Sequence, residues 1–198
     1  MTSPGVARGR EIPRKTLHLT TAVVPIGLCY GVPQRVMAVT LLALFGIACA
    51  VEYTRRRSPA FAARFSGTVG VLLRPHEVTR GVTGATWLLG AFALTCLTVP
   101  LSAAIAATWA GAVGDAAAAI VGRAWSRARA STGKTLAGSA ACVVTTALGL
   151  MWLTEFSAVA ASLLGLVAAA VERPSVALDD NVRVTASVAI VAAVFLWI

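Results

Sequence analysis

The sequence predicts an all-α polytopic membrane protein with about seven transmembrane helices. The chain of 198 residues is 58% hydrophobic and only 13% charged, whereas soluble domains are about half apolar and a quarter charged. Its mean hydropathy is +0.80, and its apolar residues fall into long runs between prolines and charged residues. A helix needs about 20 mostly apolar residues to cross a bilayer. This composition argues against an ordinary soluble domain.

Seven apolar segments can be drawn along the chain. Their approximate ranges are 17–31, 36–52, 82–98, 101–122, 136–154, 157–172 and 184–198. Several are shorter than a full span, so we expect tilted helices or local thinning of the bilayer. Between the segments, where a helix has to end, lie Pro33, Pro59, Pro75, Pro100 and Pro174.

The basic residues predict the orientation of these segments. With the N-terminus in the cytoplasm, every Lys and Arg except Arg35 lies on the cytoplasmic side, as the positive-inside rule requires. We therefore expect the N-terminus inside and the C-terminus outside. The whole chain, 1–198, is then one integral-membrane domain with a basic cytoplasmic segment at 1–16 and cytoplasmic loops at 53–81 and 123–135. The large excess of Arg over Lys is typical of a GC-rich bacterial genome, and predicts a bacterial inner or plasma membrane.

The stretch from Pro59 to Arg74 reads PAFAARFSGTVGVLLR and lies within the first of these loops. It combines spaced Phe, Val and Leu with two arginines. Such a pattern favours a helix or loop that lies in the plane of the membrane interface.

One carboxylate lies inside an apolar run. Asp115 stands in VGDAAAAIVGRAW, residues 113–125, in the inner half of the fourth segment. An ionisable side chain in a span costs about 2.5–3.5 kcal/mol to insert and is a functional hypothesis by default. Its neighbours Gly114, Ala118 and Gly122 form a stripe of small residues that lets helices pack closely. Close packing explains the stripe but not the carboxylate, for which a structural salt bridge is the alternative.

The predicted loop after Asp115 is basic and rich in Gly, Ser and Thr. Its Gly133-Lys134-Thr135 is similar to the end of a Walker A motif. However, Ala128 stands where that motif requires glycine, and no strand precedes it, so a Walker A motif is rejected. Backbone amides at a helix start, with Lys134 and Arg129 beside them, could still hold phosphate. An ordinary positive-inside loop explains the same residues.

Two further polar groups lie just before predicted spans on the cytoplasmic side. Arg74-Pro75-His76-Glu77 precedes the third segment, and its Arg and Glu are spaced so that they could simply pair. Asp179-Asp180-Asn181 precedes the seventh; its oxygens suit Mg²⁺ beside a phosphate, but the same residue types also cap helices. Carboxylates and cations gathered on one side favour phosphoryl transfer to a lipid head group, which needs cations on the phosphates and a base near the hydroxyl.

A succession of short motifs runs over nearly the whole chain. In order they are Arg14-Lys15-Thr16-Leu17-His18, Arg74 to Glu77 with Gly84-Ala85-Thr86, Gly114-Asp115-Ala116-Ala117-Ala118, Gly122-Arg123, Lys134-Thr135-x-x-Gly138-Ser139 and Asp180-Asn181. This succession resembles the CTP-dependent lipid kinases, the family of dolichol kinase, phytol kinase and the yeast-type diacylglycerol kinase. That family is related to the phosphatidate cytidylyltransferases. The part from Gly114 to Ser139 is the most specific.

The resemblance implies an enzyme that transfers phosphate from CTP to the hydroxyl of a membrane lipid alcohol, with Mg²⁺ or another divalent metal. Its expected partners are the alcohol, the nucleotide and the bilayer, without nucleic acid. The catalytic residues implied are Asp115, Lys134 and Glu77. The nucleotide-binding residues are Gly114, Gly122, Arg123, Lys134, Thr135, Gly138 and Ser139. The metal ligands are Asp115, Asp180 and Asn181, and the polar residues on the substrate side are Lys15, His18, Arg74 and Glu172.

Two positions depart from the family pattern. Ala137 stands where the family usually has Glu, and Thr185 stands near the place of a proline. The missing acid leaves open an altered metal site, an altered substrate or lost activity, unless Glu77, Glu172 or Asp179 replaces it. Two other functions are therefore retained: a cytidylyltransferase that forms a CDP-lipid, although its long C-terminal signature is missing, and a non-enzymatic membrane protein such as a transporter or a catalytically degenerate homologue.

Overall fold

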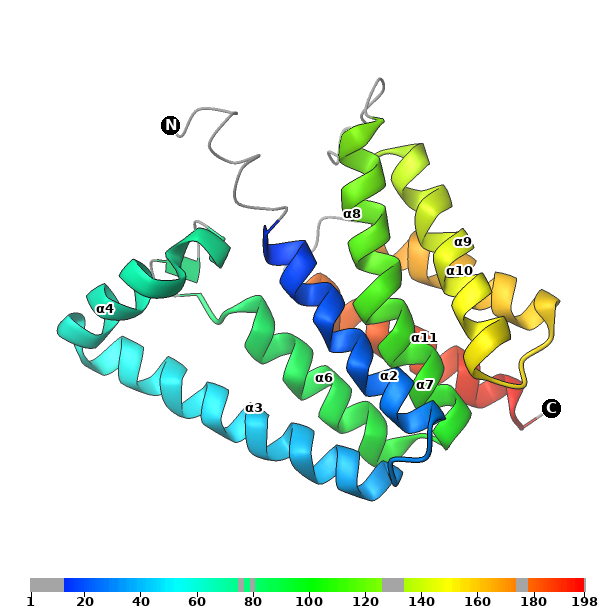
Figure 1. The fold of residues 1–198 in the computed structure, drawn as a ribbon, viewed down its shortest axis with the longest axis horizontal. Coiled ribbons are helices and arrows are strands. Elements are labelled where there is room, and N and C mark those ends of the chain that lie inside the picture. The colour runs from blue at the N-terminus through cyan, green and yellow to red at the C-terminus, as the bar shows by residue number, and fades with distance from the viewer. Residues whose placement is uncertain (1–12, 75–76, 79–80, 126–133, 174–177, 198) are drawn as a thin grey trace.

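The structure is a computed structural model, and it describes residues 13–74, 77–78, 81–125, 134–173 and 178–197. Within these ranges the chain is helical and has no strand, which confirms the predicted all-α class (Figure 1). In chain order the elements are helical residues 13–19, η1 (Thr20–Ala22), α2 (Val23–Cys29), α3 (Gln34–Arg57), α4 (Pro59–Val69), η2 (Gly70–Leu72), α6 (Gly84–Thr98), α7 (Leu101–Trp109), η3 (Ala110–Gly114), α8 (Asp115–Ala124), α9 (Leu136–Leu153), α10 (Ala158–Glu172) and α11 (Asp180–Phe195).

Each predicted apolar segment coincides with a helix or a run of joined helices. Residues 13–29 form one continuous helical run, and α7, η3 and α8 form another. Three helices of the described chain are long and apolar enough to cross a membrane, namely Gln34–Arg57, Leu101–Ala124 and Leu136–Leu153. The helices Gly84–Thr98 and Ala158–Glu172 are apolar but shorter.

Three helix boundaries differ from the sequence prediction. The first helical run, residues 13–29, is called the first helix below, and it includes Lys15, which was predicted to lie in a basic tail. The helix α3 continues to Arg57 because its buried Arg55 pairs with Glu52 at 2.6 Å, which satisfies both charges. The helix α11 starts at Asp180 because the Asp179 carboxylate accepts a hydrogen bond from the backbone N–H of Asn181 at 3.0 Å.

The run of α7, η3 and α8 lies at the centre of the bundle. Six consecutive residues of α7, from Ala103 to Thr108, are buried. Side chains this small let neighbouring helices approach from several sides, and α7 accordingly contacts α2, α6, α9 and α11. One core cluster lies between α7, α9, α10 and α11, and a second lies between α2, α3, α6 and α7. Asp115 is therefore carried by the most enclosed part of the fold.

A tryptophan of α7 packs closely against a glycine of α9. The indole N–H of Trp109 donates to the Thr145 carbonyl at 3.0 Å. A Cβ atom on Gly149 would lie only 1.9 Å from Trp109 Nε1. The absence of a side chain at position 149 is thus what makes room for the indole.

The helix α4 lies at the edge of the molecule, away from α7 (Figure 1). Ser58 caps it by accepting a hydrogen bond from the Phe61 N–H at 3.2 Å, and Pro59 occupies its first turn, as helix starts favour. All of its side chains are at least partly exposed. The helical alternative for the segment after Pro59 is therefore confirmed over Pro59–Val69.

Candidate functional site

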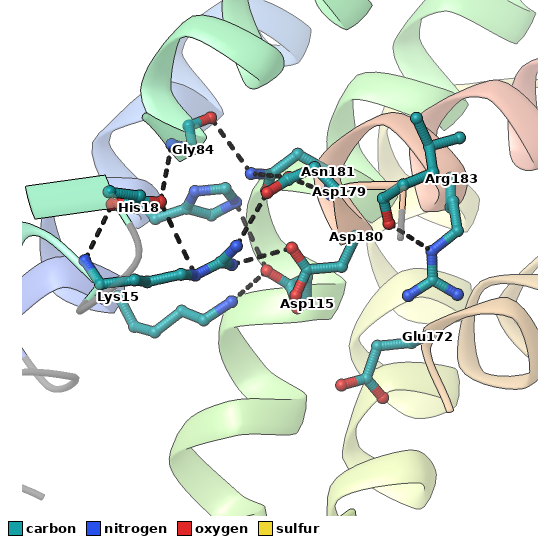
Figure 2. Close-up of polar contacts among 12 residues, drawn as sticks. Lys15, His18, Gly84, Asp115, Glu172, Asp179, Asp180, Asn181 and Arg183 are labelled. Carbon is teal, nitrogen blue, oxygen red and sulfur yellow. Dashed lines mark hydrogen bonds and ion pairs between the residues drawn. The ribbon is translucent and has the colours of Figure 1, made fainter. Parts of the chain in front are cut away.

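Polar side chains from separate parts of the chain gather around Asp115 (Figure 2). They come from the first helix, the segment before α6, α8, the start of α9, the end of α10 and the start of α11. The members of this polar cluster are Lys15, His18, Arg74, Glu77, Asp115, Lys134, Glu172, Asp179, Asp180 and Asn181. Asp180 adjoins Asp115 closely enough for their charges to interact.

Asp115 is buried, with 2% of its side chain exposed, and is paired on one oxygen only. Lys15 Nζ forms an ion pair with Oδ2, and His18 Nε2 lies 3.7 Å from the same oxygen. Oδ1 has no hydrogen-bond partner among the described residues. The pair with Lys15 agrees with a structural salt bridge. However, buried polar atoms normally have a partner, so the unpartnered second oxygen indicates that Asp115 also binds a ligand.

A π-helical turn, η3, immediately precedes Asp115. Such turns insert one extra residue into an α-helix and occur frequently at functional sites. The carbonyl of Gly111 in this turn lies 2.7 Å from His18 Nε2. A Cβ atom on Gly111 would lie 2.6 Å from Thr185 Oγ1 of α11. The turn and its glycine therefore bring the first helix and α11 close to the carboxylate.

Three of the predicted nucleotide-binding glycines lie where α8 meets α9. A Cβ atom on Gly114 would lie 2.5 Å from Thr146 Oγ1, and one on Gly122 would lie 2.8 Å from Thr135 Oγ1. Gly138 faces the Ala118 carbonyl, 2.6 Å from where its Cβ would be. The predicted close packing of the small-residue stripe is confirmed at these positions, and their role toward a nucleotide stays a prediction.

The other residues predicted to bind the nucleotide lie around the same helix junction. The Thr135 hydroxyl caps α9 by accepting from the Gly138 N–H at 3.0 Å. Ser139 is in the first turn of α9, and its hydroxyl is buried with no hydrogen-bond partner in the described part of the chain. Arg123 is in the last turn of α8 and is partly buried. Arg129 and His76 lie outside the described residues.

Lys134 points into the cluster and is paired with Glu172 of α10. Glu172 is only 3% exposed, whereas Lys134 is 34% exposed. Burial alone would lower the Lys134 pKa, but the charge and hydrogen bond of Glu172, together with neighbouring carboxylates, outweigh burial and raise it. The charges of Asp115 and Asp180 act on Lys134 in the same direction. Lys134 is therefore a stable cation on the same side as both aspartates.

Arg74 ties the segment before α6 to the start of α11. Its two terminal nitrogens lie 2.8 Å from Asp179 Oδ2 and 2.9 Å from Asp180 Oδ1. Burial by itself would raise the Asp180 pKa, but Arg74 and Lys15 hold it far below its ordinary value. Burial and the neighbouring Asp180 raise the pKa of Asp179. The two adjacent carboxylates thus differ in their affinity for a proton.

Glu77 and Asn181 hold the backbone on either side of the contacts between Arg74 and the two aspartates. Glu77, which is 2% exposed, accepts from the N–H of Arg74 at 2.8 Å and from the N–H of Gly84 at 3.0 Å. The Asn181 amide donates to the Gly84 carbonyl at 3.2 Å. The pairing that the sequence allows between Arg74 and Glu77 is therefore mainly a backbone contact, since their side chains approach only to 3.9 Å.

Replacing Arg74 with glutamine is expected to destabilise the protein by about 3 kcal/mol, because two poorly exposed carboxylates lose their partner. Arg74 depresses the pKa of Asp180, so its contribution is present above the ordinary Asp pKa and is lost as pH falls through the lower folded value. The difference in melting temperature between Arg74→Gln and the unaltered protein should be largest near neutral pH and should shrink below about pH 4.

Thermal unfolding of the detergent-solubilised protein at several pH values measures this difference. Arg64→Gln, on the exposed side of α4, also removes one positive charge but leaves the contacts of Arg74 with Asp179 and Asp180 intact. It serves as the control. A difference in melting temperature between Arg74→Gln and the unaltered protein that does not change with pH would contradict the role given to Arg74 in lowering the Asp180 pKa.

The fit of a divalent metal to the predicted ligands can be tested against these contacts. In the described part of the chain, no three His, Cys, Asp or Glu side chains are grouped to hold a metal ion by themselves. Mg²⁺ at a phosphate needs only one or two carboxylates, because phosphate oxygens and water complete its shell. The unpartnered Oδ1 of Asp115 and the nearby Asp180 fit that arrangement, while Asn181 is engaged by Gly84 and Asp179 through its amide nitrogen.

An apolar pocket of about 420 Å³ adjoins the polar cluster. Its walls come from the first helix, from α4 and η2, and from α6. His18, Glu77, Gly84 and Asn181 line it and also belong to the contacts described above. The pocket and the polar cluster are therefore continuous.

Two features of this region were not predicted from the sequence. Glu52 and Arg55 form a buried network in which Arg55 donates to the Glu77 and Gly81 carbonyls, and Glu52 accepts from the Thr83 N–H at 2.9 Å. An acid and a base three residues apart at the end of an apolar run was the signal that could have revealed it. The π turn before Asp115 has no comparable signal in the sequence.

Comparison of the chain with protein-family models, with curated proteins and with solved structures finds no match in any of the three.

Proposed function

We propose that the protein is a lipid-alcohol kinase, which transfers the terminal phosphate of CTP to the hydroxyl of a membrane lipid alcohol. The observation that carries this proposal is the polar cluster: Lys15, Arg74 and Lys134 lie beside Asp115 and Asp180, although they come from distant parts of the chain. The sequence resemblance supports the choice of CTP as donor. The neighbouring apolar pocket supports a lipid as acceptor.

In the proposed reaction, Asp115 accepts the proton of the alcohol as its oxygen attacks the terminal phosphorus. The bond between that phosphorus and the bridging oxygen breaks, and CDP leaves with the electron pair. Lys134 and Arg74 neutralise phosphate charge, which is the main demand of phosphoryl transfer. Asp115 and Asp180 would hold Mg²⁺, which supplies further neutralisation of the phosphates when it is bound. Lys15 and His18 orient the Asp115 carboxylate.

The location proposed for this reaction is the cytoplasmic face of a bacterial inner membrane. The proposal takes the seven helical runs as spans, with the N-terminus inside and the C-terminus outside. All the basic members of the cluster then lie on the cytoplasmic side, where nucleotides are available. The helix α4 would lie in the membrane interface.

The proposal is tested with the full chain in detergent, Mg²⁺, CTP labelled on its terminal phosphate and a panel of polyprenol, phytol and diacylglycerol. A labelled lipid and free CDP are expected. No labelled lipid with any alcohol would overturn the kinase proposal. Release of pyrophosphate instead of CDP would identify a cytidylyltransferase.

Lys134→Gln is expected to weaken CTP binding by roughly ten- to a hundredfold, because one charge-assisted hydrogen bond to a phosphate contributes about 1.5–3 kcal/mol. CTP-dependent thermal stabilisation measures binding apart from turnover. Arg56→Gln, which removes an exposed positive charge at the end of α3, is the matched control. Equal CTP affinity in Lys134→Gln and Arg56→Gln would remove Lys134 from the nucleotide site.

A further inference from the structure

We propose that the apolar pocket between the first helix, α4 and α6 binds one hydrocarbon chain, so that the protein selects lipid alcohols with a single chain over those with two. The identity of the head group rests on the proposed function. The site for the chain rests on the pocket itself and can be tested without turnover.

The lining of the pocket is that of a site for a hydrocarbon. Leu73 and Leu88 are buried in it at 7% and 4% exposure. Leu17 of the first helix, Phe65 of α4 and Leu89 of α6 supply further apolar surface. A chain placed here covers these apolar side chains and removes them from contact with water.

The polar residues of the pocket fix the direction in which the chain would lie. His18 lines the pocket and is also 3.7 Å from Asp115 Oδ2. Asn181 lines it from the start of α11, beside Asp180. A hydroxyl at this end would adjoin the carboxylate that has an unpartnered oxygen in the described chain, and the hydrocarbon would extend toward Phe65 and Leu89.

The size of the pocket suits one chain. About 420 Å³ is near the lower end of the range of roughly 300–1,000 Å³ for pockets that enclose a drug-sized ligand. A diacylglycerol would have to leave its second chain outside, against the surface of α4. A polyprenol or phytol, which has one chain, fits with its first units inside and the remainder in the bilayer.

The helix α4 forms the wall of this pocket that lies at the edge of the molecule (Figure 1). It packs on α3 and η2, and all of its side chains are at least partly exposed. Two contacts hold the Phe65 side chain of α4 in place. The Arg55 guanidinium lies over its ring at 5.4 Å, and the Phe61 ring stacks on it at 6.3 Å. Arg55 is itself held by Glu52. Phe65, which lines the pocket, is thus held in position within its wall.

The experiment uses a long-chain primary alcohol that carries a diazirine, photolysed with the full chain in nanodiscs, and mass spectrometry locates the label. Label is expected on Phe65, Leu89 and their neighbours. Ala85→Trp should reduce this label at least fivefold, because Ala85 lines the pocket and its exposed side chain can be enlarged without entering the core. Ala43→Trp, an identical change on the exposed side of α3, should leave the label unchanged.

Competition separates one chain from two. Phytol is expected to displace the probe at concentrations at least tenfold lower than diacylglycerol. Equal displacement by the two lipids, or label that Ala85→Trp does not reduce, would overturn the inference. If the labelling is as expected but the protein has no kinase activity, the inference about the pocket stands and only the kinase proposal is contradicted. Kinase activity with label spread evenly over the outer surface would retain the kinase proposal and overturn the pocket.

Discussion

Asp115→Asn is expected to reduce phosphate transfer by at least a hundredfold. The amide keeps the size of the side chain but cannot accept a proton, and general-base catalysis contributes about 10²–10⁴ in rate. It also removes the charge that Lys15 faces. Transfer of labelled phosphate from CTP to lipid measures the effect. A rate equal to that of the unaltered protein would exclude Asp115 as the base.

Loss of the fold has to be separated from loss of chemistry in this variant. Breaking a buried ion pair by removing one partner costs about 3–5 kcal/mol, because a buried charge is left alone. The double variant Lys15→Met with Asp115→Asn removes both charges and should recover much of the melting temperature without recovering activity. Glu155→Gln, an exposed acid after α9, should change neither quantity. Activity recovered in the double variant would assign Asp115 a structural role.

Gly149→Ala is expected to cause a large loss of stability, because its new Cβ atom makes the shortest contact of any described glycine. The new Cβ would lie 1.9 Å from Trp109 Nε1, so the indole has to move and its hydrogen bond to the Thr145 carbonyl is lost. Overpacking costs about 1–3 kcal/mol and the hydrogen bond about 1 kcal/mol, which gives a total on the order of 3 kcal/mol. Thermal unfolding in detergent measures it.

The same chain offers a control and a rescue for this substitution. Apart from its chain neighbours and the backbone of its own helix, Gly46 of α3 has no atom of the described chain within 4 Å of its Cβ position. Gly46→Ala should therefore stabilise the helix by roughly 0.5–1 kcal/mol. Trp109→Leu removes the indole, and combining it with Gly149→Ala should cost much less than the two single changes added together. Additive losses would show that the indole is not the source of the strain.

The sequence alone predicted the helical class and the positions of the helices, because the apolar runs and prolines are local signals. Asp115 could also be found, since an ionisable side chain in such a run is a functional hypothesis by default. Its partner could not. Lys15 lies 100 residues away, and Arg74 reaches Asp179 and Asp180 across 105 and 106 residues. Nothing in the local pattern specifies contacts of that separation.

Packing that depends on the shapes of facing side chains could not be predicted from the sequence either. The fit of Trp109 against Gly149 requires the relative rotation of α7 and α9, which the residue types do not encode locally. The π turn changes the helical register by one residue just before Asp115, whereas the sequence pattern assumes a regular helix of 3.6 residues per turn. The faces predicted for residues on the two sides of this turn are therefore offset from those in the structure.

The polar cluster also has a consequence for biosynthesis. It joins Lys15 near the beginning of the chain to Asn181 near its end, through Arg74 and Asp115 in between. Translation proceeds from the N-terminus, so this set of contacts cannot close until α11 has left the ribosome. Until then Arg74 has not met Asp179 and Asp180, and the groups proposed to bind nucleotide are not in one place. A nascent chain that ends before α11 would therefore lack the contacts of Arg74 and Asn181 that close this cluster.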